Sequence, residues 1–132
     1  MKVVMSGSMQ FASDMLELKD RLEALGHTAL LPKGIERFIH GEIVVEKKQA
    51  KLEGDVFNYY YNELKRADAL LVLNKTKSGV QNYIGGNALI EMAFAYVLKK
   101  KIYLINPIPD MSYSDEIAAM NPSVLHNDLS HM

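Results

Sequence analysis

One carboxylate stands inside an apolar stretch of this chain. The stretch is NYIGGNALIEMAFAY, residues 82–96, and its only charged residue is Glu91. A charge buried alone is costly unless it is paired or hydrogen-bonded, so its presence here calls for a reason. Gly85 and Gly86 precede it, and glycines before a helix offer backbone N–H groups that suit a phosphate or a sugar hydroxyl. These residues indicate a carboxylate beside a binding site, although a glycine pair also occurs in ordinary loops.

The surroundings of Glu91 leave two roles open. At about 100° per residue, its neighbours on the helix include Ala88 and Ala95, two small side chains that leave a hollow beside the carboxylate. The alternative is helix capping. With Ala88 as N-cap, Glu91 takes the N3 position of a capping box. With Asn87, the better N-cap residue, Glu91 falls at N4, past the box.

Small polar residues also follow the first apolar run of the chain. Ser6, Gly7 and Ser8 come at the end of KVVMSG, and a hydroxyl there either holds a phosphate or caps the next helix. The chain contains neither G-x-G-x-x-G nor a Walker sequence, so no dinucleotide or nucleoside-triphosphate fold is indicated.

Short apolar runs alternate with helical patterns along the chain. The runs lie at residues 2–7, 27–32, 69–74 and 101–106, and residues 123–132 add a last strand or a docking tail. The segments between the runs repeat their apolar residues at helical spacing. The pattern predicts an α/β fold in one domain, residues 1–132: a Rossmann-like or flavodoxin-like parallel sheet of about five strands with helices on both faces. Residues 33–55 are mixed in character, and we expect broken helix and loop there.

Ligands of such sheets bind beyond the carboxyl ends of the strands. Segments 6–9, 74–86 and 106–113 all follow predicted strands, so we expect them at one edge. Asp68 opens a strand at its amino end instead, which favours a turn residue or helix terminator.

Composition excludes several classes of function. The 132 residues include no cysteine, which rules out disulfide and thiolate chemistry, and the net charge of −1 leaves no basic surface for nucleic acid. No apolar run approaches the ~18 residues of a membrane span, and the first residues lack the apolar stretch of a signal peptide. We therefore expect a cytoplasmic protein without membrane partners. The four histidines lack metal-ligand spacing, so no metal and no cofactor are expected.

Three blocks of the chain, which together span most of it, resemble the nucleoside 2-deoxyribosyltransferase family and its relatives, the deoxynucleoside 5′-monophosphate N-glycosidases. They are VVMSGSM, RADALLVLN and GGNALIEMAFAYVLKKKIYLINP. The resemblance implies that Glu91 is the nucleophile and that Asp68 is an aspartate near the active site. It also implies substrate contacts from the two small-residue loops, namely Ser6, Gly7, Ser8, Gly85, Gly86 and Asn87.

The implied reaction is cleavage or transfer at the N-glycosidic bond of a (deoxy)nucleoside or nucleoside monophosphate. Its transition state is oxocarbenium-like, and a carboxylate such as Glu91 attacks the anomeric carbon or stabilises its charge. Gly85 and Asn87 depart from the family pattern, and no lysine or arginine lies within residues 81–95. This favours an unphosphorylated nucleoside as substrate. A non-catalytic nucleotide-binding sensor and a purely structural protein are the alternatives.

The segment ALIEMAFAYVL, residues 88–98, is apolar on more faces than one sheet covers in a small domain. The family resemblance implies dimers or larger assemblies with active sites near subunit interfaces. We therefore expect a homodimer or a higher homo-oligomer.

Overall fold

The structure of the chain is a computed structural model that describes residues 1–35 and 55–132. Five parallel strands form one sheet in the order β2-β1-β3-β4-β5. The strands are β1 (Lys2–Gly7), β2 (Thr28–Leu30), β3 (Ala69–Leu73), β4 (Lys101–Leu104) and β5 (Ser123–Val124). The predicted α/β fold with a parallel sheet is confirmed. The broken helix and loop expected over residues 33–55 lie, apart from their ends, outside the described residues.

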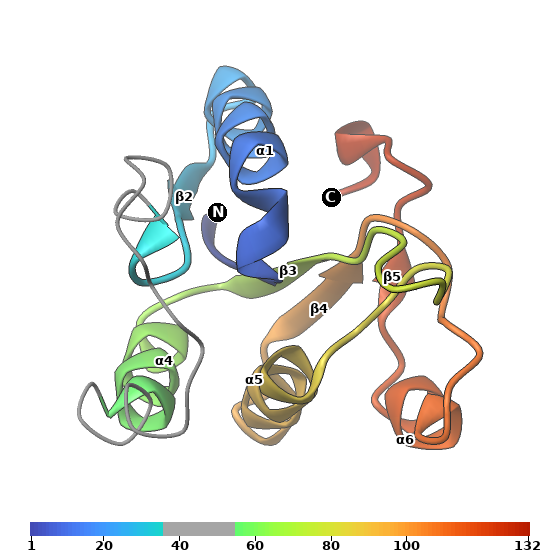
Figure 1. The fold of residues 1–132 in the computed structure, drawn as a ribbon. Coiled ribbons are helices and arrows are strands. Elements are labelled where there is room, and N and C mark those ends of the chain that lie inside the picture. Colours follow the sequence, from blue (N-terminus) through green and yellow to red (C-terminus); the bar gives the residue numbers. More distant parts are fainter. Residues whose placement is uncertain (36–54) are drawn as a thin grey trace.

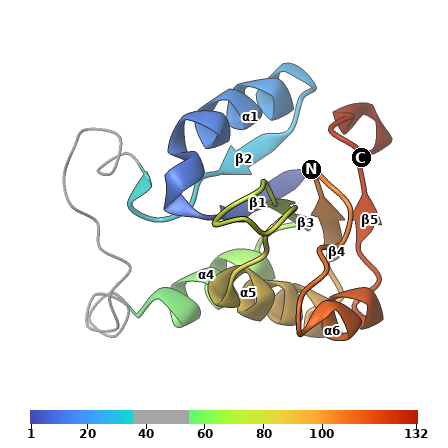
Figure 2. The same ribbon diagram turned by 45° about the vertical axis from the view of Figure 1, so that its right-hand side comes forward.

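Helices cover both faces of the sheet (Figures 1 and 2). One face carries α1 (Ala12–Ala24), with the short 3-10 helices η1 (Met9–Phe11) and η2 (Leu129–His131). The other face carries α4 (Val56–Lys65), α5 (Gly86–Val97) and α6 (Ser114–Ala119). None of the helices in the described parts of the chain is long and apolar enough to cross a membrane.

The two-residue period of the strands divides the core into two layers. Val3 and Met5 of β1 pack into the cluster on the α1 side, whereas Val4 packs into the cluster on the α5 side. Because successive side chains of a strand point to opposite faces, Ser6 shares the face of Val4. The alternation of β1 therefore turns a hydroxyl toward α5.

The strand order reverses between β1 and β3, because the chain extends from β1 to β2 on one side and from β3 to β5 on the other. Such a switch point is where ligands bind in flavodoxin-like sheets. Gly7 ends β1 there with φ +153°, and a Cβ on it would lie 2.9 Å from the carbonyl oxygen of Leu73. Only glycine fits this close approach of the two strand ends.

Candidate active site

Helix α5 begins beside the switch point. Its first residue is Gly86, and Gly85 is its N-cap in an extended conformation. Glu91 is therefore the sixth residue of the helix, so both capping alternatives, at N3 and at N4, are wrong. The helix starts earlier than either alternative required, and the first N–H groups of α5 have no acceptor within the helix.

Glu91 is buried against the sheet, with 5 % of its surface exposed. The Oγ atom of Ser6 donates a short hydrogen bond to its Oε2 atom. This contact joins β1 to α5 across residues far apart in the chain, and it follows from the strand alternation that turns Ser6 toward the helix. A hydrogen bond to an ionised carboxylate is among the stronger ones in proteins, so it holds the carboxylate in one orientation.

A buried phenol on α4 lies near the same carboxylate. Burial chiefly, and the charge of Glu91 next, raise the pKa of the Tyr60 hydroxyl above its usual value of 10.0. The hydroxyl accepts a hydrogen bond from the backbone N–H of Lys33. The helical spacing of Val56, Tyr60 and Leu64 puts Tyr60 on the apolar side of α4, but only the packing of α4 beside α5 brings this hydroxyl near Glu91.

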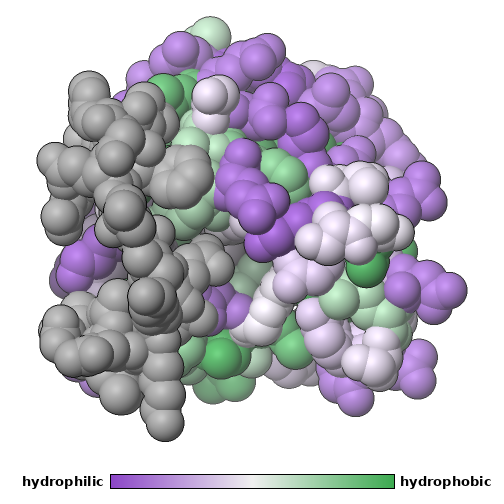
Figure 3. Space-filling view, viewed as in Figure 1, coloured by the Kyte–Doolittle hydropathy of each residue, from purple (hydrophilic) through white to green (hydrophobic). Residues whose placement is uncertain are grey.

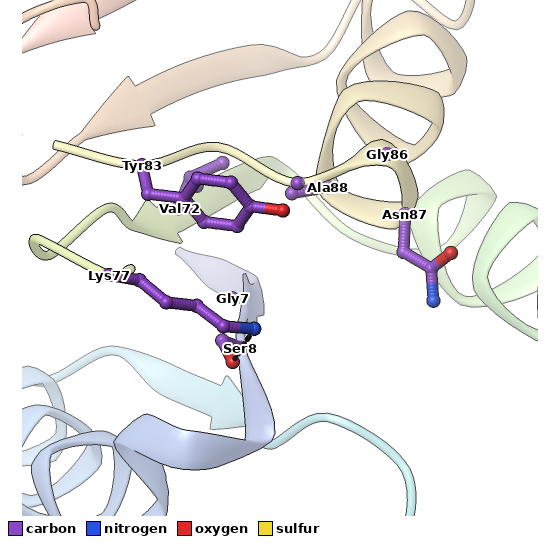
Figure 4. Close-up of a pocket in the computed structure, with 9 residues that line it drawn as sticks. Gly7, Ser8, Val72, Lys77, Tyr83, Gly86, Asn87 and Ala88 are labelled. Atoms are coloured by element: carbon purple, nitrogen blue, oxygen red, sulfur yellow. Dashed lines mark hydrogen bonds between the residues drawn. The ribbon is translucent and has the colours of Figure 1, made fainter. Parts of the chain in front are cut away.

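A pocket of about 210 Å³ opens between the ends of β1 and β3 and the start of α5 (Figure 4). Its lining brings together five of the six predicted substrate-binding residues, all but Ser6. The lining residues are Gly7, Ser8, Val72, Lys77, Tyr83, Gly85, Gly86, Asn87 and Ala88. Ser6 lies one residue before this wall and contacts Glu91 instead.

Glu91 follows the lining residues Asn87 and Ala88 by one turn of α5. Helical side chains lean toward the helix N-terminus and cover the turn before their own Cα atom. The side chain of Glu91 therefore covers the turn that contains Asn87 and Ala88, and both residues line the pocket. Its hydrogen-bond partner, Ser6, is followed at once by Gly7, another lining residue. The carboxylate is thus held next to the inner wall.

A lysine reaches into the pocket from the loop after β3. The Nζ atom of Lys77 donates a hydrogen bond of 3.0 Å to the Oγ atom of Ser8 and lies 5.3 Å from the centre of the Tyr83 ring (Figure 4). Lys75, by contrast, forms an ion pair of 2.8 Å with Asp14 of α1, and neither residue lines this pocket. The preference for an unphosphorylated nucleoside rests on the lack of lysine and arginine within residues 81–95. The loop after β3 supplies a cation from outside that range, because it brings Lys77 into one lining with residues 85–87.

Ser8 has two contacts in this region. As the N-cap of η1, its hydroxyl accepts a hydrogen bond of 3.3 Å from the N–H of Gln10, so the predicted capping role is confirmed. The same hydroxyl lines the pocket and accepts the hydrogen bond of Lys77. A phosphate contact of Ser8 stays a prediction.

Asp68 lies at the opposite edge of the sheet. Its Oδ2 atom accepts a hydrogen bond of 2.8 Å from the N–H of Lys2, at the amino ends of β1 and β3. The pocket lies beyond the carboxyl ends of the same strands, so the structure does not bring Asp68 together with Glu91. The contact is that of a residue that anchors the start of a strand.

Within residues 1–35 and 55–132, no group of three or more His, Asp or Glu side chains is arranged to hold a metal ion. The polar groups at the pocket are one cation, hydroxyls, an amide and backbone N–H groups. Such donors suit an anionic or hydroxyl-rich organic ligand.

Two solved structures of enzymes resemble this chain in fold, whereas no sequence match was found. No protein-family model and no curated protein sequence matches the chain. A 2-deoxyribosyltransferase from the psychrotolerant bacterium Bacillus psychrosaccharolyticus superposes with a TM-score of 0.56 and 18 % identity, over 79 % of this chain and 71 % of that one. The CMP N-glycosidase BcmB of Clostridium botulinum superposes with a TM-score of 0.52 and 12 % identity, over 94 % of this chain and 85 % of that one.

The chain shares the fold of these two enzymes. The resemblance inferred from the sequence blocks is thereby confirmed at the level of the fold. At identities of 18 % and 12 %, the assignment of individual site residues depends on the geometry of this chain alone.

Proposed function

We propose that this chain is an enzyme that cleaves or transfers the N-glycosidic bond of a (deoxy)nucleoside or its 5′-monophosphate, with Glu91 as nucleophile. The observation that carries the proposal is the buried carboxylate of Glu91, held by Ser6 behind a polar pocket at the switch point of the sheet. The fold shared with a 2-deoxyribosyltransferase and a CMP N-glycosidase supports the same class of reaction.

In the proposed reaction, a carboxylate oxygen of Glu91 attacks the anomeric carbon while the bond from that carbon to the base nitrogen breaks. The electron pair leaves with the base, which takes up a proton, and the sugar becomes an ester of Glu91. Water or a second base then attacks the same carbon and releases the carboxylate. The charge on the carboxylate stabilises the oxocarbenium-like transition state of both steps. Ser6 acts as a positioning residue, because its hydroxyl bonds to the nucleophile and it is not among the described residues that line the pocket.

The pocket favours the monophosphate over the free nucleoside. Lys77, the hydroxyl of Ser8 and the N–H groups at the start of α5 all lie in one lining. A cation together with backbone donors at a helix start is the arrangement that binds phosphate groups. We therefore assign the phosphate to this part of the pocket and the sugar to the wall in front of Glu91.

The test is base release by Glu91→Gln and Glu91→Ala variants, measured by chromatography on a panel of nucleosides and nucleoside monophosphates. Both variants are expected to lose the activity while circular dichroism stays that of the parent, because neither side chain can attack. Glu116→Gln, an exposed position on α6, is the matched control and is expected to keep full activity.

Retention of more than about a tenth of the rate by Glu91→Gln, a barrier change below ~1.4 kcal/mol, would contradict the nucleophile role. The sensor alternative gives a different result. A binding module gains thermal stability with one of the compounds but releases no base from any of them. No observation in the structure favours that alternative.

A further inference from the structure

A tyrosine hydroxyl in the pocket makes no hydrogen bond to the described part of the chain. Tyr83 lies on the segment between β3 and α5, lines the pocket and is half-buried. Its only hydrogen bond within residues 1–35 and 55–132 is made by the backbone N–H, which donates to the carbonyl oxygen of Lys75 at 3.0 Å. A phenol both donates and accepts hydrogen bonds, so this hydroxyl is available to a ligand.

The backbone around Tyr83 is held on both sides. Its own N–H bonds to Lys75, and the carbonyl oxygen of the next residue, Ile84, accepts a hydrogen bond from the hydroxyl of Tyr113, the N-cap residue of α6. The side chain of Ile84 is fully buried. A side chain with a fixed backbone and few rotatable bonds loses little freedom when it binds a ligand. The ring of Tyr83 is therefore a preorganised part of the pocket.

Gly85 shows where the hydroxyl of Tyr83 lies. As the N-cap residue of α5, Gly85 has φ −82° and ψ 174°, an extended conformation that any residue adopts, so the backbone does not require glycine here. A Cβ atom on Gly85 would lie 3.2 Å from both the Cε1 atom and the hydroxyl oxygen of Tyr83, closer than an ordinary van der Waals contact. The missing side chain of Gly85 therefore makes room for the ring, and the hydroxyl is directed toward the first turn of α5 (Figure 4).

Further donors belong to the same lining. The Nζ atom of Lys77 lies 5.3 Å from the centre of the Tyr83 ring and donates a hydrogen bond of 3.0 Å to Ser8. The first N–H groups of α5 have no acceptor within the helix. In the space-filling view, residues of intermediate hydropathy, the class of tyrosine, serine and glycine, gather around the start of α5, whereas the surface over α1 is mostly hydrophilic (Figure 3). Among the described residues of the lining, Lys77 is the one charged residue, and the other donors are neutral.

A single cation leaves part of a phosphate charge unbalanced. A phosphate monoester carries a charge of about −1.5 to −2 at neutral pH and has three strong acceptor oxygens. With Lys77 as the one cation of the described lining, up to about one negative charge remains for neutral donors to stabilise. Hydrogen bonds to an ionised acceptor are roughly twice as strong as those between neutral groups. A fixed hydroxyl beside the cation and the helix start is therefore suited to a phosphate oxygen.

We propose that Tyr83 is a specificity-determining residue whose hydroxyl donates a hydrogen bond to the phosphate of a nucleoside 5′-monophosphate. The inference rests on the proposed function, because it names a further contact of the same pocket. The face of the ring attracts the ammonium group of Lys77, and the hydroxyl extends from the edge of the same ring. One side chain thus holds the cation in place and supplies a donor of its own. A free nucleoside leaves this hydroxyl without an anion to meet.

The first test is Tyr83→Phe, which removes the hydroxyl, keeps the ring and should leave the circular dichroism unchanged. kcat/KM for a deoxynucleoside 5′-monophosphate should fall at least about tenfold, mainly through KM, because a hydrogen bond to a charged group is lost. The free deoxynucleoside lacks the phosphate and should change by less than about twofold. Tyr96→Phe, an exposed position on α5 outside the pocket, is the matched control and should leave both substrates unchanged. Equal losses of kcat for both substrates would mean that the hydroxyl serves the leaving base and would overturn the proposal.

The second test needs no turnover. The binding of ribose 5-phosphate and of ribose is measured by calorimetry with the parent chain and with Tyr83→Phe. The variant should bind ribose 5-phosphate about tenfold more weakly, whereas ribose should show no difference between the two proteins. This pattern supports the role of Tyr83 even if no base is released from any compound, a result that would contradict the proposed reaction alone. Equal affinities of the two proteins for ribose 5-phosphate, or no binding by the parent chain, would overturn the proposal.

The placement of the hydroxyl is tested by Gly85→Ala. The extended backbone accepts alanine, but the new methyl group meets the Tyr83 ring and should displace the hydroxyl. We expect Gly85→Ala to weaken the binding of ribose 5-phosphate about as much as Tyr83→Phe does. The double variant should lose no more than about twofold beyond the weaker-binding single variant, because both changes act on one contact. Losses that multiply in the double variant, or a Gly85→Ala variant that binds like the parent, would overturn the assignment of Tyr83.

Discussion

Lys77 is the residue on which the choice between a nucleoside and its monophosphate depends. The informative change is Lys77→Met, which removes the ammonium group that lies over the Tyr83 ring and keeps most of the apolar stem. The hydrogen bond of Lys77 to Ser8 is lost as well, but Ser8 keeps its capping contact with Gln10. The change therefore alters the charge of the pocket more than its shape.

The size of the effect follows from the position of the ammonium group. A unit charge about 4 Å from a phosphate oxygen contributes about 4 kcal/mol at an effective dielectric constant of 20, before desolvation is subtracted. Hydrogen bonds to charged groups contribute about 1.5–3 kcal/mol net. Since Lys77 is half-buried, we expect kcat/KM for the monophosphate to fall by about 1.5–3 kcal/mol, roughly 10- to 150-fold.

The assay compares kcat/KM for a deoxynucleoside and for its 5′-monophosphate in the parent and in Lys77→Met. The free nucleoside should change by less than about threefold, because it carries no charge for the lysine to meet. Lys75→Met is the matched control: it removes the same charge two residues away, where the lysine pairs with Asp14. That variant should leave the ratio of the two substrates unchanged.

Two results would refute this reasoning. Equal losses for both substrates in Lys77→Met would mean that the lysine supports the loop instead of the phosphate. A parent enzyme that prefers the free nucleoside tenfold or more, about 1.4 kcal/mol, would mean that the cradle of Lys77, Ser8 and the start of α5 does not bind a phosphate.

Two further predictions concern the framework of the site. Gly7→Ala should lower the free energy of unfolding by about 1–3 kcal/mol in denaturant titrations, because φ +153° strains any other residue and the new methyl group meets Leu73. The control is Gly86→Ala, where the space is open, and it should lower the free energy of unfolding by no more than a few tenths of a kcal/mol. Equal losses in the two variants would contradict this account. Because the folded state raises the pKa of Tyr60 above 10.0, the chain should lose stability as the pH rises above about 10, where unfolding releases the phenolic proton. Tyr60→Phe should show a shallower loss over the same range in thermal melts, and a slope identical to the parent would exclude Tyr60 as its source.

The fold follows from local patterns. Buried parallel strands read as short apolar runs, and helices repeat their apolar residues every three or four positions, so the order of elements is visible along the chain. Glu91 is recognisable in the sequence as well, because a charged side chain is rarely buried among apolar residues, as Glu91 is in α5, unless it is paired or hydrogen-bonded. The convergence of segments 6–9 and 74–86 follows as well, since both come after strands of one parallel sheet.

The contacts of the site depend on tertiary structure, because they join residues whose separation along the chain says nothing of their distance in space. Strand alternation puts Ser6 on the face of Val4, but only the packing of α5 on that face brings Glu91 to its hydroxyl. The path of one loop decides that Lys77 enters the pocket while Lys75 pairs elsewhere. The place of Asp68, by contrast, is visible in the sequence, because Asp68 opens a strand and the ligands of a parallel sheet bind beyond the carboxyl ends of its strands.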